Sequence, residues 1–130
     1  MKFSLIMPTI NVTTELKLFL DSLKKQTYKN FELIVVDQNK DTRAYEIIKL
    51  YEEDFEIKYM KNNEIGLSVN RNKGLFMMSG DIAAFPDDDC EYSPDTLEKI
   101  VKYFEKNKDK KIYSCRTLEK GKDYGTGVML

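Results

Sequence analysis

Apolar residues fall into two kinds of pattern along this chain. Residues 31–37, with the sequence FELIVVD, form an almost wholly apolar run that closes on a carboxylate. Shorter apolar or alternating runs occupy residues 3–7, 55–60 and 82–85, so four strands are predicted. Pro8 is expected to end the first strand, because proline has no N–H to donate to a sheet.

Between and after these strands, apolar residues recur at the i, i+3, i+4 spacing of one helix face, which predicts four helices. Their expected starts are Thr13 or Thr14, the turn before Ala44, a cap at Ser68, and Ser93 with Pro94. The clearest apolar faces are Leu16, Phe19, Leu20 and Leu23; Ala44, Ile47, Ile48 and Tyr51; and Leu97, Ile100, Val101 and Phe104. A fifth strand is expected at 112–115 and a glycine-rich loop at 120–127.

Apolar strands that alternate with amphipathic helices are typical of a parallel sheet. The chain is therefore predicted to be an α/β protein in three layers, with a mostly parallel, doubly wound, Rossmann-like sheet and helices on both faces. Its 130 residues suit one domain, residues 1–130. Such sheets bind ligands beyond the carboxyl ends of their strands, where residues 8–11, 37–39 and 87–89 are expected.

Composition excludes several classes of function. Basic and acidic residues nearly balance, at 21 and 22, so no nucleic-acid or polybasic membrane contact is expected. No apolar run approaches the roughly 20 residues of a membrane span. The two cysteines form no disulfide framework, and a reduced, cytoplasmic location is expected. The chain has no histidine, which excludes Ser-His-Asp catalysis and HExxH zinc sites.

Three consecutive carboxylates, Asp87, Asp88 and Asp89, follow the apolar run at 82–85. Adjacent like charges raise one another's pKa, and a bound hard cation relieves that cost. Carboxylate oxygens suit Mg²⁺ and Mn²⁺, so the triplet is interpreted as a metal and nucleotide site. The alternative is a solvated turn that caps the next helix. A calcium loop is disfavoured, because Tyr92 stands where its sharp turn requires glycine.

Asp37 and Arg71 are further polar residues expected near this edge. Asp37 closes a buried strand, where a carboxylate either caps the next turn or accepts a hydrogen bond from a nucleobase N–H. Arg71 lies between Gly66 and Gly74, on a helix whose N-terminus favours anions. Its guanidinium suits a base carbonyl or a phosphate, the alternative being a side chain in water. Cys90 is interpreted as structural, since acidic neighbours raise the pKa of a thiol.

Four ordered blocks resemble the nucleotide-binding half of family 2 glycosyltransferases, which have the GT-A fold. They read SLIMPTIN at 4–11, LKKQ and YKNFELIVVD within 23–37, GLSVNRNKG at 66–74 and GDIAAFPDDD at 80–89. The resemblance covers nearly the whole chain. It implies transfer of a sugar from a nucleotide-diphosphate donor, with a UDP-sugar favoured by family habit, to a glycan or lipid-linked acceptor. It further implies inversion and a dependence on Mg²⁺ or Mn²⁺.

The resemblance also assigns roles by position. The implied nucleotide-binding residues are Pro8, Thr9, Ile10, Asp37, Arg71, Asp87 and Asp88. Within this set, Asp37 would accept from the base and Asp88 would contact the ribose. Asp89 would hold the metal, with Asp87 opening the DxD-type motif. The chain departs from the family at Ile10, where an aromatic residue is common, and at Gln38, where a second acid is common.

The family's catalytic base, an Asp or Glu, is expected beyond Leu130, together with most of the acceptor site. The chain is therefore expected to be a truncated, donor-binding part of a longer enzyme. The alternative is a non-catalytic nucleotide-binding or interaction module. A receiver-type signalling domain is disfavoured, because it needs acids after the first strand, where this chain has PTIN. Attachment to the inner face of the membrane, oligomeric state, sugar and linkage stay open.

Overall fold

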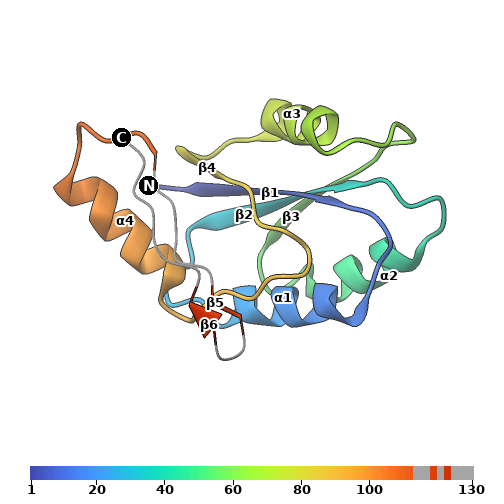
Figure 1. Cartoon of the computed structure of the whole chain (residues 1–130), viewed down its shortest axis with the longest axis horizontal. Helices are drawn as coiled ribbons and strands as arrows, with labels where there is room; N and C mark the ends of the chain where they lie inside the picture. The colour runs from blue at the N-terminus through green and yellow to red at the C-terminus, as the bar shows by residue number, and fades with distance from the viewer. Residues whose placement is uncertain (113–117, 120–121, 124–130) are drawn as a thin grey trace.

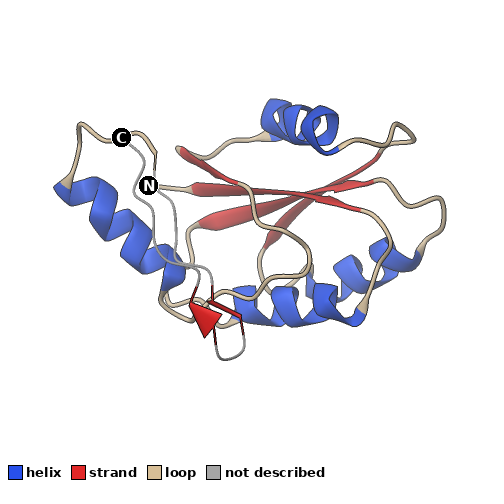
Figure 2. Cartoon of the chain, viewed as in Figure 1, coloured by secondary structure: helices blue, strands red, loops and turns tan. Residues whose placement is uncertain are grey.

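The computed structural model describes residues 1–112, 118–119 and 122–123, which form strands and helices in alternation (Figures 1 and 2). The strands are β1 (Phe3–Thr9), β2 (Phe31–Asp37), β3 (Glu56–Lys61), β4 (Ile82–Ala84), β5 (Leu118–Glu119) and β6 (Lys122–Asp123). The helices are α1 (Thr14–Lys24), α2 (Arg43–Ile48), the short 3-10 helix η1 (Lys49–Tyr51), α3 (Leu67–Met77) and α4 (Thr96–Lys106).

Strands β1 to β4 form one sheet in the order β3-β2-β1-β4, and each neighbouring pair is parallel. Figure 1 shows α3 on one face of this sheet and α1 and α2 on the other. The predicted α/β architecture, with a mostly parallel sheet and helices on both faces, is therefore confirmed. The carboxyl ends of β1 and β2 come together, since Thr9 pairs in register with Asp37.

The two faces of the sheet are built from alternate residues of the same strands. Phe3, Leu5 and Met7 of β1 join a buried core that also takes residues from α1 and α4. The opposite face is covered by α3, where a Cβ on Gly74 would overlap the Cγ2 of Ile6. Glycine at this position therefore lets α3 lie directly on the sheet, above the strands that end at the candidate site.

Glu32 is a fully buried carboxylate near the amino end of β2. It accepts hydrogen bonds from Ser4 Oγ (2.7 Å), Ser79 N (2.7 Å), Ser79 Oγ (2.9 Å) and Lys58 Nζ (2.8 Å). Burial alone would raise the pKa of Glu32, but the bonds from Lys58, Ser4 and Ser79 outweigh it and lower the pKa to about 2. The network ties the connection between α3 and β4 to the sheet, and so fixes where β4 delivers residues 87–89.

β1 and α3 have boundaries that differ from the sequence predictions. β1 continues through Pro8 to Thr9, so the predicted stop at Pro8 is wrong. β4 pairs only with the first part of β1, so beside Pro8 the one described neighbour is β2. A proline is tolerated at such an edge-like position. The N-cap residue of α3 is Gly66, so the predicted cap at Ser68 is also wrong.

α4 begins later than predicted. Its N-cap residue is Asp95, so the predicted start at Ser93 and Pro94 is wrong. The Ser93 carbonyl accepts from Gln26 Nε2 at 2.7 Å, and the Pro94 carbonyl accepts from Thr27 N at 2.8 Å. These two residues therefore bind the connection between α1 and β2 instead of opening a helix.

The carboxyl-terminal predictions are only partly within the described residues. Ile112, the first residue of the predicted fifth strand, is not in a strand, and residues 113–115 lie outside the described part. Within the predicted loop at 120–127, residues 122–123 instead form β6, antiparallel to β5, and the rest lie outside the described part. In the described part of the chain, no helix combines the length and the apolar character needed to cross a membrane.

Candidate functional site

The carboxyl edge of the sheet brings together the three predicted segments. The Thr9 hydroxyl at the end of β1 donates to Asp88 Oδ2 at 2.7 Å. The Thr9 carbonyl accepts from Gln38 N, just beyond β2, at 2.9 Å. Thr9 is only 1% exposed, so its side chain does not line the surface of this edge; it holds Asp88 through the hydrogen bond. Pro8 and Ile10, on either side, are half-buried.

Asp88 is the most sheltered carboxylate of the triplet, since Asp87 and Asp89 are exposed. Desolvation raises the pKa of Asp88, and the negative charges of Asp89 and Asp87 raise it further. The hydrogen bond from Thr9 acts in the opposite direction. The charges of Asp87 and Asp89 therefore act on Asp88 as the like-charge repulsion that the sequence predicts.

Asp37 is fully buried, and both of its carboxylate oxygens have partners. Oδ1 accepts from the backbone N–H of Asn39 at 2.9 Å and from its Nδ2 at 2.8 Å. Oδ2 accepts from the Tyr59 hydroxyl and forms an ion pair of 3.8 Å with Lys61 Nζ. Asn39 Oδ1 in turn accepts from the N–H of Asn11, which has a φ of 57°. Asp37 thus anchors a network that shapes the loop after β1.

Arg71 lies on α3 and points toward the acidic loop. Its Nη2 is 3.9 Å from Asp87 Oδ1, and its guanidinium carbon lies 5.5 Å from the centre of the Phe85 ring. The Nε of Arg71 is buried and has no hydrogen-bond partner among the described residues. Because the ion pair is long and Asp87 is 69% exposed, it holds Arg71 only weakly. The guanidinium is therefore free to exchange Asp87 for an incoming anion.

Two polar residues, Gln38 and Asn70, hold the start of α3 in place. Neither was predicted from the sequence to be a site residue. Gln38 Oε1 accepts from the N–H of Gly66 at 3.0 Å. Asn70 is fully buried, and its Nδ2 donates to the carbonyls of Gly66 (2.7 Å) and Glu64 (2.9 Å). The bond to Gln38 links the residue after β2 to the start of α3, whereas the bonds from Asn70 hold α3 to the loop before it. The position of Arg71 therefore depends in part on the residue that follows Asp37.

A divalent cation is compatible with the acidic loop. Among the described residues, no group of three or more Asp, Glu, Cys or His side chains converges as a ready cage. Mg²⁺, however, is commonly held by one or two carboxylates together with substrate phosphates and waters. The exposed Asp87 and Asp89, on either side of the repelled Asp88, fit such a partial ligand set.

Cys90 beside the triplet has no features of a nucleophile. Burial raises its pKa to about 11, and the charges of Asp87 and Asp89 add to that effect. The thiol donates to the Asp87 carbonyl at 3.0 Å. The structural role predicted for Cys90 is therefore supported.

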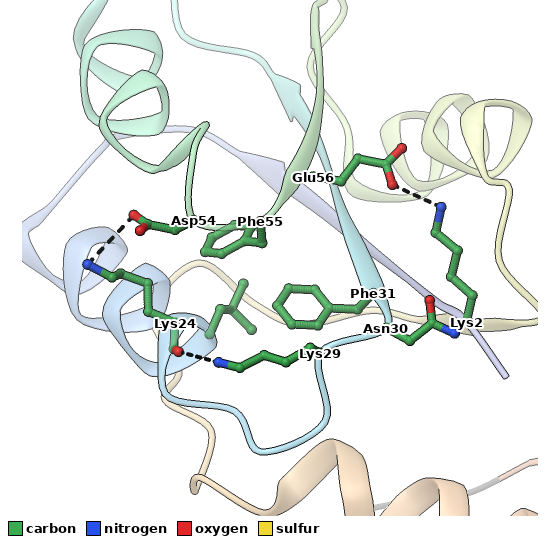
Figure 3. A pocket seen from close by; sticks show the side chains of 9 residues that line it. Lys2, Lys24, Lys29, Asn30, Phe31, Asp54, Phe55 and Glu56 are labelled. Carbon is green, nitrogen blue, oxygen red and sulfur yellow. Dashed lines mark hydrogen bonds and ion pairs between the residues drawn. The ribbon is translucent and has the colours of Figure 1, made fainter.

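A pocket of about 280 Å³ opens at the opposite edge of the sheet, near the amino ends of β2 and β3 (Figure 3). Two of its three lysines form ion pairs, Lys2 with Glu56 at 2.9 Å and Lys24 with Asp54 at 3.6 Å, and Lys29 Nζ donates to the Lys24 carbonyl at 2.8 Å. Figure 3 shows these contacts as dashed lines between residues that line the pocket. Each of these three lysines already has a partner in the pocket wall, so the candidate site remains at the carboxyl edge.

Sequence reasoning placed Asn39 at this edge but missed Tyr59 and Lys61, the partners of Asp37 on β3. The register of β2 and β3 pairs Val35 with Tyr59 and Asp37 with Lys61. A period of two along β3 would have placed residues 57, 59 and 61 on one face, which is the available signal. It does not say which strand lies beside β2, so the contact itself depends on the topology.

A parallel α/β sheet with polar side chains converging at its carboxyl edge defines a class of ligand-binding domains that includes many nucleotide-binding proteins. Within that class the comparisons identify the family. The family model described as "Glycosyl transferase family 2" matches residues 4–128, and the chain belongs to that family. The resemblance and the GT-A fold predicted from the sequence are thus confirmed.

Relatives and solved structures agree with this assignment. Glycosyltransferase GlyA of Streptococcus pneumoniae serotype 4 is 40% identical over 107 residues, covering 78% of this chain and 15% of that protein. A GalNAc(5)-diNAcBac-PP-undecaprenol beta-1,3-glucosyltransferase of Campylobacter jejuni is 33% identical over 103 residues, covering 77% of this chain and 33% of that protein. The structure of S. aureus TarS 1-349 in complex with UDP-GlcNAc is 29% identical, with a TM-score of 0.76 over 82% of this chain and 32% of that chain. The chain thus spans a third or less of the length of these proteins.

Proposed function

We propose that this chain binds the nucleotide of a UDP-sugar at the carboxyl edge of its sheet, as the donor-binding part of an inverting glycosyltransferase. The observation that carries this proposal is that Asp37, Arg71 and Asp88 lie at one edge of the sheet. Asp88 is held there by a 2.7 Å hydrogen bond from Thr9. The TarS neighbour, solved in complex with UDP and with UDP-GlcNAc, supports the choice of donor. The acceptor in this proposal is a glycan or a lipid-linked glycan precursor, and the location is the cytoplasm.

In this proposal the nucleoside lies against the ends of β1 and β2. Pro8 and Ile10 flank the base, and Thr9 acts from beneath by holding Asp88. Asp37 accepts from the base N–H, and Asp88 accepts from the ribose. These roles are supported by the register of Thr9 with Asp37 and by the hydrogen bond from Thr9 to Asp88.

The diphosphate is expected near the acidic loop and α3. Arg71, whose Nε lacks a partner among the described residues, donates to a phosphate oxygen or to the base. Asp87 and Asp89 are the residues that would hold Mg²⁺ or Mn²⁺. When bound, the cation neutralises the negative charge that builds on the departing diphosphate. Release of Asp87 from its long contact with Arg71 would leave both groups available for the donor.

Calorimetric titration of UDP into the chain, with and without Mn²⁺, tests this proposal. We expect saturable binding that requires the cation, and we expect Asp89→Ala to abolish it. Asp109→Ala is the matched control, because it also removes an aspartate side chain, one that is 78% exposed and forms an ion pair with Lys110. Binding that is independent of the cation and unaltered in Asp89→Ala would refute the metal assignment. The absence of any UDP binding by the unmodified chain would refute the proposal as a whole.

A further inference from the structure

Lys61 ends β3 directly beside the carboxylate of Asp37, with which it is paired in register. Its Nζ donates to the carbonyl of Asp41 and lies 3.8 Å from Asp37 Oδ2. An ammonium group has three N–H donors. Among the described residues, the contact with Asp41 is the only hydrogen bond that Lys61 Nζ makes, and 3.8 Å is too long for a second. Among the described residues, Lys61 Nζ therefore has N–H donors without an acceptor, next to the proposed position of the base.

The two carboxylate oxygens of Asp37 differ in how many hydrogen bonds they can still accept. Each carboxylate oxygen accepts about two hydrogen bonds. Oδ1 already accepts two from Asn39, whereas Oδ2 accepts one from Tyr59. The remaining acceptor position is thus on Oδ2, the oxygen that faces Lys61.

Lys61 is also the partner of Asp37 with the most freedom to move. Asp37 is fully buried and Asn39 is only 6% exposed, so their contacts are enclosed. The side chain of Lys61 is 36% exposed, and its ion pair with Asp37 is longer than a hydrogen bond. An outward swing of Lys61 would open the free position on Oδ2 without disturbing the bonds from Asn39 or Tyr59.

From this geometry we infer that Lys61 and Asp37 form a donor and acceptor pair that selects a base carrying an N–H next to a carbonyl. The inference rests on the proposed function, because it assumes that the base of the donor lies at this edge. Asp37 Oδ2 accepts from N3–H of uracil, and Lys61 Nζ donates to a flanking carbonyl oxygen. Lys61 is thereby a specificity-determining residue, in addition to those assigned from the sequence.

The same pair rejects cytosine. Its N3 carries no hydrogen at neutral pH, so its lone pair would face the lone pairs of Asp37 Oδ2. The exocyclic amino group of cytosine is a donor and would face the ammonium of Lys61. A site built from buried polar groups discriminates strongly against a ligand that leaves those groups unpaired.

Titration of UDP and CDP into the chain in the presence of Mn²⁺ tests the inference, because the two ligands differ only in the base. We expect the unmodified chain to prefer UDP. Lys61→Met is expected to weaken UDP binding about tenfold and to leave CDP binding nearly unchanged, so that the preference narrows. Lys61→Arg retains a charged donor and is expected to keep the preference. Lys24→Met is the matched control, since Lys24 has a similar ion pair of 3.6 Å at the opposite edge.

The outcomes separate the inference from the function on which it rests. If Lys61→Met weakens UDP and CDP equally, Lys61 acts only by attracting the diphosphate, and the inference is wrong. If the variant changes neither affinity while remaining folded by circular dichroism, the inference is also wrong and the proposed function stands. If the unmodified chain binds neither nucleotide, both are refuted.

Discussion

Replacing Glu32 with glutamine is expected to destabilise the chain far more than the same change at a surface glutamate. Glu32 has no exposed surface, and its two oxygens accept from Ser4, Ser79 and Lys58. Glutamine keeps one carbonyl oxygen but turns an NH₂ group toward one of these donors. It also leaves Lys58 without its closest carboxylate, at 2.8 Å.

The expected magnitude follows from the pKa of Glu32, which falls from its usual 4.5 to about 2 in the folded chain. At about 1.4 kcal/mol per pH unit, the ionised carboxylate contributes about 3 kcal/mol to the free energy of unfolding at pH 7. The folded pKa lies below the unfolded one, so this contribution is complete above the unfolded pKa. It is lost as the pH falls toward the folded pKa, and about 1.4 kcal/mol remains at pH 3.

Urea unfolding of the unmodified chain and of Glu32→Gln, at pH 7 and at pH 3, measures both quantities. We expect a difference in unfolding free energy of about 3 kcal/mol at pH 7 that narrows by about half at pH 3. Glu56→Gln is the control, because Glu56 pairs with Lys2 at 2.9 Å but its side chain is 50% exposed. That change is expected to cost less than about 1 kcal/mol. A cost below about 1 kcal/mol for Glu32→Gln, or a difference that does not narrow at low pH, would refute the reasoning.

Two further substitutions test the packing of α3 and the support of the acidic loop. Gly74→Ala places a methyl group against Ile6, so we expect about 1–3 kcal/mol of destabilisation in urea unfolding, despite the better helix propensity of alanine. Ser68→Ala, at an exposed position of α3, is the control and is expected to change little; unchanged stability in Gly74→Ala would contradict the close approach. Thr9→Val keeps the side-chain shape but removes the donor to Asp88, so we expect UDP binding in the presence of Mn²⁺ to weaken severalfold by calorimetry. Thr27→Val removes an exposed hydroxyl that donates to Glu98 and is expected to leave binding unchanged; an equal effect of both variants would contradict a specific role for Thr9.

The sequence predicts the strands of this fold better than the starts of its helices. β2 occupies the predicted residues 31–37, because an apolar run with a polar residue at each end leaves little choice of boundaries. The predicted start of α4 was wrong because the carbonyls of Ser93 and Pro94 accept hydrogen bonds from Gln26 and Thr27. Those partners are more than 60 residues away, and a local capping pattern carries no information about them.

The residues of the candidate site also differ in how well the sequence predicts them. Asp37 and the acidic triplet stand out because they close apolar strands, and parallel strands that end together must bring them to one edge. Tyr59 and Lys61 did not stand out, since a tyrosine and a lysine in a partly exposed strand are unremarkable by type. Their importance comes from the register of β3 with β2, which no pattern within either strand determines.

β3 lies at one border of the described four-stranded sheet, so one side of its backbone has no strand beside it there. A bare strand border invites pairing with a second molecule, and charged side chains discourage that association. β3 carries Glu56, Lys58 and Lys61 along its six residues, which gives this border a solubilising set of charges. Lys61 would therefore influence self-association as well as the choice of base. Light scattering should accompany the titrations of Lys61→Met, because removing its charge makes β3 a better template for aggregation.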